Sequence, residues 1–341
     1  MKAPQEAVRI VIAGASSLRG RDLKLCIEES DFPLSDIRLV DEELAAGTLT
    51  EAAGLPAVIE TLDEDSFDRT RFAFFTGSSA FSAQHGRQAV RSGAVVIDLS
   101  GGLWAEPGAK PWIPALDALL PSPVGKRAAG EAQSLYLVPS TPAQVAISIS
   151  AAFAPAGLDR LALTFFQPVS ERGREGVEEL EDQVVKLLSF QPIPQLVFDT
   201  QVGFNMVSTY GAGSDETLAD TRGKIAGEVR SYLAGRIPMP ALALYHAPVF
   251  YSHTFSAFAE FKSQPALDDL VERLQQAGLK VTAAGDEPPT SVNVAGEGRP
   301  VAGQPERDPG IENGVWIWGA ADNMRVPATT GVAIAEMLLA S

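Results

Sequence analysis

Short apolar runs rich in β-branched and aromatic residues alternate with amphipathic segments in the first third of the chain. Val8–Ala13, Phe72–Phe75 and Ala94–Asp98 are nearly continuous apolar runs, a pattern typical of strands buried on both faces. A fourth strand is expected over 36–40, and residues 83–92 have helical spacing. Strands that alternate with helices predict an α/β domain with a parallel, doubly wound sheet.

The pattern changes near residue 140, where longer helices and alternating strands replace the short apolar runs. The expected elements are strands over 161–166 and 315–318, one long antiparallel strand over 246–261, helices over 176–188, 219–233 and 328–339, and an exposed loop over 285–310. These elements predict a second domain of the α+β class. One face of its sheet is expected to pair with another subunit.

Composition narrows the classes of partner. The length of 341 residues suggests two domains, and 45% hydrophobic residues are enough for two cores. The net charge of −16 argues against nucleic acid and anionic membranes, which need a basic face. The segment Met1–Gln5 has no apolar signal core. We therefore expect a soluble cytoplasmic protein.

The count of sulfur and imidazole groups limits the site chemistry. The single cysteine, Cys26, excludes an internal disulfide and fits a reducing compartment. Three histidines and one cysteine argue against a dedicated metal site. The spacing of Cys26 with Leu23 and Ile27 indicates a helix-core contact.

A glycine-containing turn follows the first strand and resembles an incomplete dinucleotide fingerprint. Gly14 and Gly20 stand where its first and last glycines belong, but Ser17 replaces the middle glycine. With Ser16 and Leu18, these residues are the candidate contacts to a pyrophosphate at a helix N-terminus. Ordinary turn chemistry explains the same glycines equally well.

An acidic cluster ends the second expected strand. Asp41 lies about 20 residues after the glycine turn, where a carboxylate can bond a ribose 2′-hydroxyl. Asp41, Glu42 and Glu43 would repel a 2′-phosphate, so NAD is favoured over NADP if a dinucleotide binds. A solvated acidic loop is the alternative interpretation.

Several blocks along the chain resemble the aspartate-β-semialdehyde dehydrogenase family. They are the turn at 14–20, the passage at 89–98, the glutamine block at 166–180, the histidine block at 248–254 and the segment at 322–325. The resemblance implies a Rossmann-like domain over 1–137 and 320–341, closed by the C-terminal helix. It also implies a catalytic and dimerisation domain over 138–319, and a homodimer.

That family works through a cysteine thiolate, which this chain lacks at the matching place. The resemblance assigns the orienting glutamine to Gln167 and the proton-transfer histidine to His253. The nucleophile position falls on Ser140 or Thr141, and the alignment does not decide between them. An alcohol is far less acidic than a thiol, so it is a poor replacement without a positioned base.

The family's anion-binding residues are also replaced. The arginine that binds the substrate carboxylate becomes His246, and the phosphate-binding arginine becomes Trp104. Ser78 stands for one of the paired glycines before the next helix, and Asn323 remains from the C-terminal cofactor segment. These losses resemble those of the Usg-type homologues within that family.

Three hypotheses follow from this pattern. The first is a pseudoenzyme that keeps the dimeric scaffold and a binding, regulatory or structural role. The second is an active NAD-dependent oxidoreductase that acts on an aldehyde or oxo group of a less anionic substrate. The third is an interaction module that pairs with a true dehydrogenase. A serine hydrolase is disfavoured, because the chain has no Gly-x-Ser-x-Gly elbow.

Overall fold

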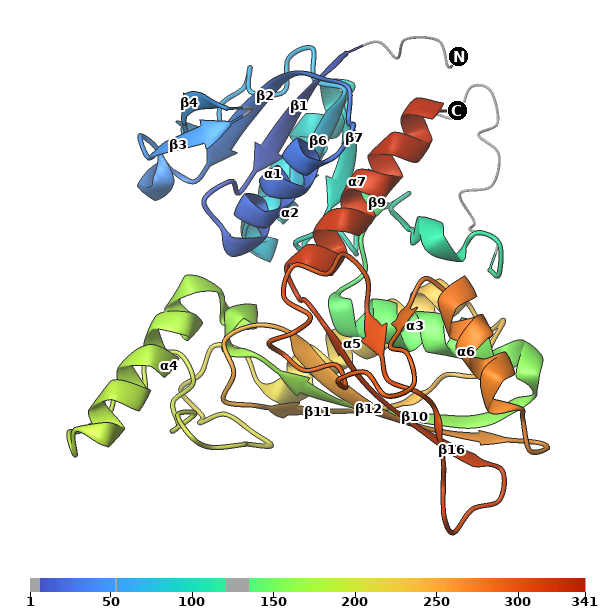
Figure 1. Ribbon diagram of the computed structural model, residues 1–341. Helices are drawn as coiled ribbons and strands as arrows, with labels where there is room; N and C mark the ends of the chain where they lie inside the picture. The colour runs from blue at the N-terminus through green and yellow to red at the C-terminus, as the bar shows by residue number, and fades with distance from the viewer. Residues whose placement is uncertain (1–6, 53, 121–134, 341) are drawn as a thin grey trace. The chain divides into compact units, whose positions relative to one another are not determined.

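The computed structural model describes residues 7–52, 54–120 and 135–340 (Figure 1). Met1–Gln5, the segment examined for a signal sequence, lies outside the described residues. The chain divides into two compact units, each described by itself below. Unit 1 comprises the described residues of 1–114, 121–139 and 327–341, and unit 2 comprises 115–120 and 140–326.

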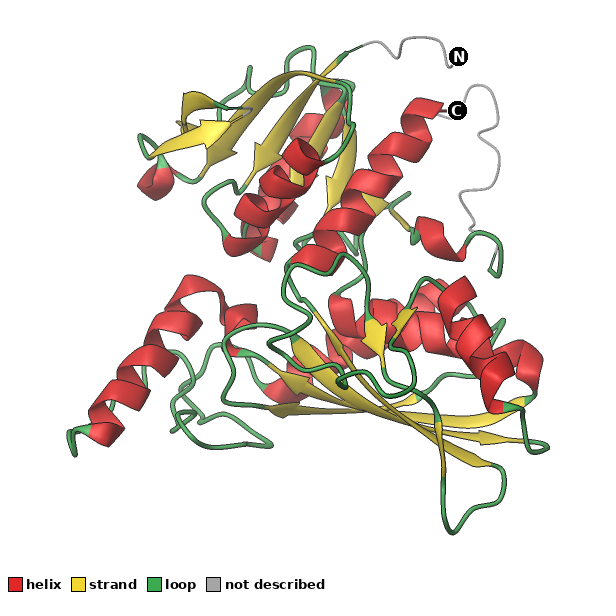
Figure 2. Cartoon of the chain, viewed as in Figure 1, coloured by secondary structure: helices red, strands yellow, loops and turns green. Residues whose placement is uncertain are grey.

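Unit 1 contains a parallel sheet with the strand order β5-β2-β1-β6-β7-β9-β8 (Figure 2). Its strands are β1 (Val8–Ala13), β2 (Leu34–Asp41), β5 (Glu60–Thr61), β6 (Phe72–Phe75), β7 (Val95–Asp98), β8 (Lys110–Pro111) and β9 (Leu135–Leu137). A separate hairpin joins β3 (Leu49–Ala52) to β4 (Leu55–Val58). The helices are α1 (Leu18–Glu29), α2 (Ser79–Arg91) and α7 (Arg325–Ala340).

Two apolar cores cover the two faces of this sheet. Alternate residues of β1 point to opposite sides: Ile10 belongs to the core that includes α1 and α7, and Val11 to the core that includes α2. Cys26 is buried in the first of these cores, as the helical spacing predicted. Helices on both faces of a parallel sheet confirm the predicted doubly wound α/β class.

Unit 2 contains a mixed sheet with the strand order β11-β10-β12-β16-β14-β13, and β15 pairs with β16. Its strands are β10 (Leu158–Gln167), β11 (Ala241–His246), β12 (His253–Phe261), β13 (Lys280–Val281), β14 (Val301–Ala302), β15 (Glu306–Arg307) and β16 (Gly314–Ala321). Its helices are α3 (Thr141–Phe153), α4 (Gly173–Leu188), α5 (Leu218–Leu233) and α6 (Leu267–Gln276). Short 3₁₀ turns span 43–45, 114–116, 154–156 and 169–172.

Helices α3, α5 and α6 lie on one face of the unit 2 sheet (Figure 1). Every residue of α3 is buried, which fits its sequence of small and apolar residues. The opposite face carries partly exposed aromatic rings at Tyr245, Trp316 and Trp318. The sheet is therefore covered on one side only.

Two expectations about unit 2 were wrong. Residues 246–261 do not form one strand, because β11 ends at His246 and β12 begins at His253. Ser252, between them, has a left-handed φ of +69°, which breaks the extended run. Residues 285–310 are not wholly an exposed loop, since they contain β14 and β15 and bury Val294. Separately, residues 320–326, which the family resemblance assigned to the first domain, group with unit 2.

No helix within residues 7–52, 54–120 and 135–340 combines the length and apolarity that crossing a membrane requires.

Candidate functional site

The glycine turn of unit 1 needs glycine at two of the three fingerprint positions. Gly14 has φ +92°, and a Cβ there would lie 2.1 Å from the backbone N of Gly77. A Cβ on Gly20 would lie 2.5 Å from the carbonyl O of Gly14. Ser17 needs no such freedom, since its φ is −63° and it is the N-cap of α1, whose first residue is Leu18. The turn therefore keeps the close backbone approach with a serine in the middle.

Side chains of the turn and of β2 already use several of its N–H donors. The Ser17 hydroxyl accepts from the Gly20 N–H and donates to the Thr76 carbonyl, both at 2.9 Å. Asp41 is buried, and its carboxylate accepts from the N–H groups of Ser16 and Glu42 at 2.7 and 2.8 Å. Asp41, the carboxylate predicted to bind a ribose, is thus hydrogen-bonded to the backbone of the glycine turn.

The other cofactor residues lie at two different places. Ser78 caps α2 by accepting from the Phe81 N–H, and its hydroxyl donates to Glu42 at 3.3 Å. This places a second carboxylate beside a helix N-terminus of unit 1. The turn and helix geometry fits a dinucleotide. Asn323 belongs instead to unit 2.

In unit 2, three of the predicted residues form a row across neighbouring strands. Gln167 of β10 is in register with His246 of the parallel strand β11. On its other side, the antiparallel pair Phe166 and Thr254 places Gln167 next to His253 at the start of β12. Laterally adjacent residues point to the same face of a sheet, and all three side chains are at most 2% exposed. We call His246, Gln167 and His253 the polar row.

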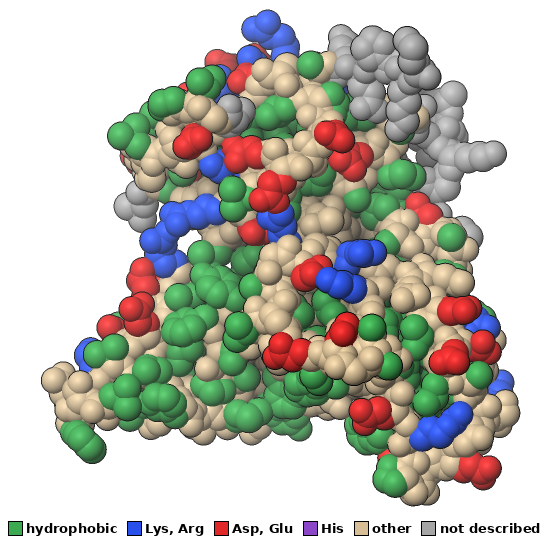
Figure 3. Space-filling model, in the orientation of Figure 1, with side chains coloured by type: hydrophobic (Ala, Val, Ile, Leu, Met, Phe, Trp, Pro, Cys, Tyr) green, Lys and Arg blue, Asp and Glu red, His purple; other side chains and the backbone are tan. Residues whose placement is uncertain are grey.

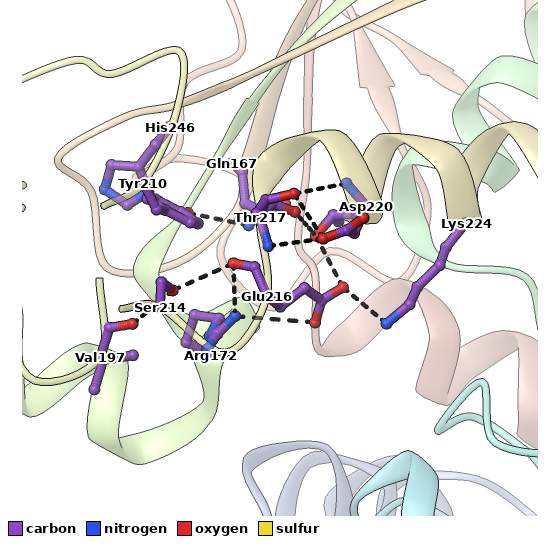
Figure 4. A network of polar contacts seen from close by, with 11 residues as sticks. Gln167, Arg172, Val197, Tyr210, Ser214, Glu216, Thr217, Asp220, Lys224 and His246 are labelled. Carbon is purple, nitrogen blue, oxygen red and sulfur yellow. Dashed lines mark hydrogen bonds and ion pairs between the residues drawn. The ribbon is translucent and has the colours of Figure 1, made fainter. Parts of the chain in front are cut away.

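A tyrosine that the sequence did not indicate joins two members of the polar row (Figure 4). The Gln167 Nε2 donates to the Tyr210 hydroxyl at 3.4 Å, and that hydroxyl lies 3.0 Å from His246 Nδ1. The rings of Phe198 and Tyr210 pack on His246 with centroids 5.3 and 5.6 Å away. Burial lowers the pKa of His246 to about 4, and burial raises the pKa of Tyr210 far above its ordinary value. Both groups are therefore neutral near pH 7.

The third member of the row is held by a carboxylate and an amide. His253 Nε2 lies 3.2 Å from Glu171 Oε1, which also accepts from Asn323 Nδ2 at 2.9 Å. Asn323 further donates to Ser170 Oγ and accepts from the N–H of Ser252. Both amide hydrogens of Asn323 are thus used inside unit 2. A contact from Asn323 to a cofactor, as predicted, would therefore have to use its Oδ1 atom or require a rearrangement of these hydrogen bonds.

The two candidate nucleophiles have different surroundings at the start of α3. The N–H and hydroxyl of Ser140 both donate to Glu228 Oε2, at 2.8 and 2.6 Å. Thr141 is 2% exposed, and its hydroxyl has no hydrogen-bond partner among the described residues. Neither hydroxyl is hydrogen-bonded to an imidazole in that part of the chain. Cys26 packs in unit 1, where its sulfur lies 3.9 Å from Asp22 Oδ2 and 4.0 Å from Thr329 Oγ1.

Four buried polar atoms near these positions lack a partner among the described residues. They are Thr141 Oγ1, Gln167 Oε1, His246 Nε2 and His253 Nδ1. Buried polar atoms without partners are rare in folded proteins and indicate a place where water or a ligand binds. All four belong to residues that the sequence singled out; Ser252 Oγ, beside His253, is a fifth such atom.

Charged residues near the row are paired with one another (Figure 4). Arg172 Nη1 donates to the carbonyl O of Glu216 at 3.2 Å and lies 3.9 Å from its carboxylate. Lys224 Nζ lies 2.8 Å from the same carboxylate. Arg172 and Lys224 therefore share the single carboxylate of Glu216.

Two side chains of helix α4 bind the segment that precedes Tyr210. Glu179 is 5% exposed and accepts from the N–H groups of Leu196 and Val197 at 2.7 and 2.6 Å. Gln183 accepts from Val202 and Gly203 at 2.8 and 2.9 Å. The following residues bring Phe198 against Tyr210 with ring centroids 5.1 Å apart.

No sequence signal marked Tyr210 or Glu228, because both act through long-range contacts that have no local pattern. Arg172 was visible only as part of the glutamine block. No group of three or more His, Cys, Asp or Glu in the described part of the chain could hold a metal ion.

Comparison with known proteins agrees with this arrangement. The semialdehyde dehydrogenase NAD-binding domain model matches residues 9–144, and the semialdehyde dehydrogenase dimerisation domain model matches residues 150–326. A USG-1 protein homologue of Pseudomonas aeruginosa is 31% identical, with 98% of each chain covered. Aspartate-semialdehyde dehydrogenase 2 of Vibrio cholerae is 23% identical, with 97% of each chain covered.

Solved structures show the same relationship. A probable aspartate-semialdehyde dehydrogenase from Pseudomonas aeruginosa is 28% identical, with a TM-score of 0.82 over 98% of this chain and 99% of the other. Aspartate semialdehyde dehydrogenase II of Vibrio cholerae, complexed with ASA, shares the fold at 23% identity, with a TM-score of 0.84 over the same shares. The chain therefore belongs to the semialdehyde dehydrogenase family.

Proposed function

We propose that this protein is a ligand-binding homodimer of the semialdehyde dehydrogenase family that lacks the phosphorylating dehydrogenase activity. The observation that carries the proposal is the place of its sulfur: the only cysteine is buried in the core of unit 1, while the segment at 138–144 offers only alcohols. The phosphorylating dehydrogenase reaction proceeds through a covalent bond between the enzyme and the substrate. The side chain that forms this bond must be a nucleophile that is ionised near neutral pH.

Neither alcohol has the base that would activate it. The Ser140 hydroxyl donates to Glu228 at 2.6 Å, and a carboxylate is a much weaker base than the alkoxide that it would have to generate. The Thr141 hydroxyl has no partner in the described chain. With His246 neutral and Arg172 paired to Glu216, tight binding of a substrate with two anionic groups is also unsupported.

A direct test is turnover of aspartate semialdehyde. The protein is incubated with the semialdehyde, inorganic phosphate and either NAD or NADP, and the absorbance of the reduced nicotinamide is followed. Aspartate-semialdehyde dehydrogenase 2 of Vibrio cholerae is the positive control. We expect no rate above that of a Ser140→Ala/Thr141→Ala double variant, and a rate that this variant abolishes would refute the proposal.

A second candidate function rests on the histidine of the polar row. One ring nitrogen of His253 is held by Glu171 at 3.2 Å, and the other, Nδ1, is buried and has no partner among the described residues. This is the arrangement of an oriented acid or base, which an oxidoreductase acting on an aldehyde or oxo group needs for its proton. This alternative would be favoured if the protein transfers hydride from NADH to uncharged aldehydes and a His253→Asn variant loses that activity.

Unit 1 supports NAD as the dinucleotide. A bound nicotinamide cofactor would supply hydride chemistry, and the residues that we propose would hold it are Gly14, Ser16 and Leu18 of the turn. Asp41 and Glu42 put carboxylates where a 2′-phosphate would add charge. Titration with all four nicotinamide dinucleotides checks this preference, and tighter binding of NADP would contradict it.

The homodimer is proposed from the sheet face of unit 2. Residues 150–326 match the dimerisation domain model, and the uncovered face of that sheet exposes Tyr245, Trp316 and Trp318 by 39–42%. Figure 3 shows further hydrophobic side chains gathered over α4 and the segment that follows it. The exposed residues there are Val185, Leu188, Phe190, Leu196, Phe204 and Met206. Apolar surface of this kind is typical of a permanent interface.

A further inference from the structure

Gln167, Tyr210 and His246 form a short hydrogen-bonded chain whose two ends are buried and unpartnered. Tyr210 is the middle group, 3.4 Å from Gln167 Nε2 and 3.0 Å from His246 Nδ1. The ends are Gln167 Oε1 and His246 Nε2, which have no partner among the described residues. Gln167 is 2% exposed and His246 is 0% exposed, so an unmet hydrogen bond at either end is costly.

The direction of the chain fixes what each end can do. If Gln167 donates to Tyr210 and Tyr210 donates to His246 Nδ1, the neutral imidazole carries its proton on Nε2. That end is then a donor, and the amide oxygen of Gln167 is an acceptor. Reversing the amide and the tautomer exchanges the two roles. In both directions the ends are one donor and one acceptor.

Both ends lie on one face of the sheet. Gln167 and His246 are register partners on the adjacent parallel strands β10 and β11. Adjacent strands are about 4.8 Å apart. The two side chains therefore leave the sheet side by side on that face.

We propose that the polar row recognises an uncharged ligand group that both donates and accepts a hydrogen bond, such as a primary carboxamide or a hydroxyl, and that Tyr210 determines this preference. The inference rests on the proposed ligand-binding role of this site. The family resemblance expects a carboxylate-binding arginine at the position of His246. We assign to this position the recognition of an uncharged group instead.

A carboxylate meets only half of this requirement. It has no hydrogen to donate, so it satisfies the donor end and faces the acceptor end with a lone pair. It also carries a charge into a buried site, which is costly, and the Arg172 guanidinium is already paired with Glu216. A carboxamide carries both a donor and an acceptor, and no charge.

The test is isothermal titration calorimetry with three probes of equal length: succinate, succinamate and succinamide. Titrations are made near pH 7.5 without cofactor or phosphate. One missing hydrogen bond to a buried group corresponds to about a tenfold loss of affinity. We expect succinamide to bind at least about tenfold more tightly than succinate, with succinamate at or near the affinity of succinamide.

Tyr210→Phe separates recognition from folding, because it removes one hydroxyl and keeps the ring that packs on Phe198 and His246. The His246 imidazole then loses the hydroxyl that fixes its tautomer, so Nε2 is no longer fixed as a donor or an acceptor. We therefore expect the preference for carboxamide over carboxylate to fall to about threefold or less. Tyr245→Phe is the matched control, since Tyr245 is 39% exposed on the opposite face and should keep the full preference.

Equal affinities for succinamide and succinate, tighter binding of succinate, or binding of none of the probes at their highest soluble concentration would each overturn the inference. In the last case the two ends bind water only. The proposed function fails by a different measurement, because turnover of aspartate semialdehyde can be present or absent whatever these binding ratios are.

Discussion

Acidification is expected to weaken unit 2 through a single side chain, His246. Burial lowers its pKa from 6.5 to about 4, so the folded protein resists taking up a proton that the unfolded chain takes up readily. The stabilising effect is fully present above the unfolded pKa, is lost progressively as the pH falls, and is gone below the folded pKa. The difference between the two pKa values corresponds to roughly 3 kcal/mol in full, of which roughly 2 kcal/mol is lost by about pH 5.

Two measurements check this expectation. The chain has only three histidines, so a titration of the imidazole resonances by NMR, with His246→Gln to identify the signals, gives the pKa of His246 directly. Urea unfolding near pH 7 and pH 5 gives the loss of unfolding free energy, and the comparison with His246→Gln removes the effect of the acidic groups common to both proteins. Unfolding is monitored by both circular dichroism and tryptophan fluorescence, because two units need not unfold together.

The outcome that refutes the reasoning is specific. An imidazole that titrates near 6.5, or a pH-dependent loss of stability that is the same in wild type and His246→Gln, would mean that water reaches His246 Nε2 in the folded state. The packing by Phe198 and Tyr210 would then not exclude solvent.

Three further predictions concern other parts of the molecule. Gly14→Ala should destabilise unit 1 by more than about 1 kcal/mol in thermal unfolding, because its Cβ meets Gly77, whereas Gly47→Ala, with φ +82° and open space around it, should cost only the backbone strain. Asp41→Ala removes the carboxylate beside the turn and should shift dinucleotide preference toward NADP, measured by calorimetry. Trp318→Glu should weaken self-association in light scattering coupled to size exclusion, whereas Leu49→Glu, 79% exposed in unit 1, should not.

Local pattern predicted the fold of unit 1 well. Runs such as Val8–Ala13 and Phe72–Phe75 are buried on both faces, so their residue types alone identify them as strands of a parallel sheet. The predicted helices over 83–92 and 328–339 are confirmed, but α2 begins four residues and α7 three residues earlier than predicted; for α2, the cap Ser78 was not recognised.

Long-range contacts set the limit of prediction. Burial alternates over 253–261 as predicted, but the left-handed Ser252, bonded through its N–H to Asn323, precedes this strand and separates it from His246. Likewise, the sequence singled out Gln167, His246 and His253 separately, and their lateral alignment depends on the register of β10 with β11 and β12. Tyr210 could not be found, because nothing near it in sequence predicts its contact with His246.

The anchoring of residues 189–217 by Glu179 and Gln183 has a consequence for how such a protein diversifies. Tyr210 lies in the connection between α4 and α5, which is held to α4 by Glu179 and Gln183 and to β11 by the paired backbone groups of Val207 and His246. Changes confined to residues 189–217 are therefore expected to alter ligand specificity. Exchanging this segment between relatives is a direct way to transfer that specificity.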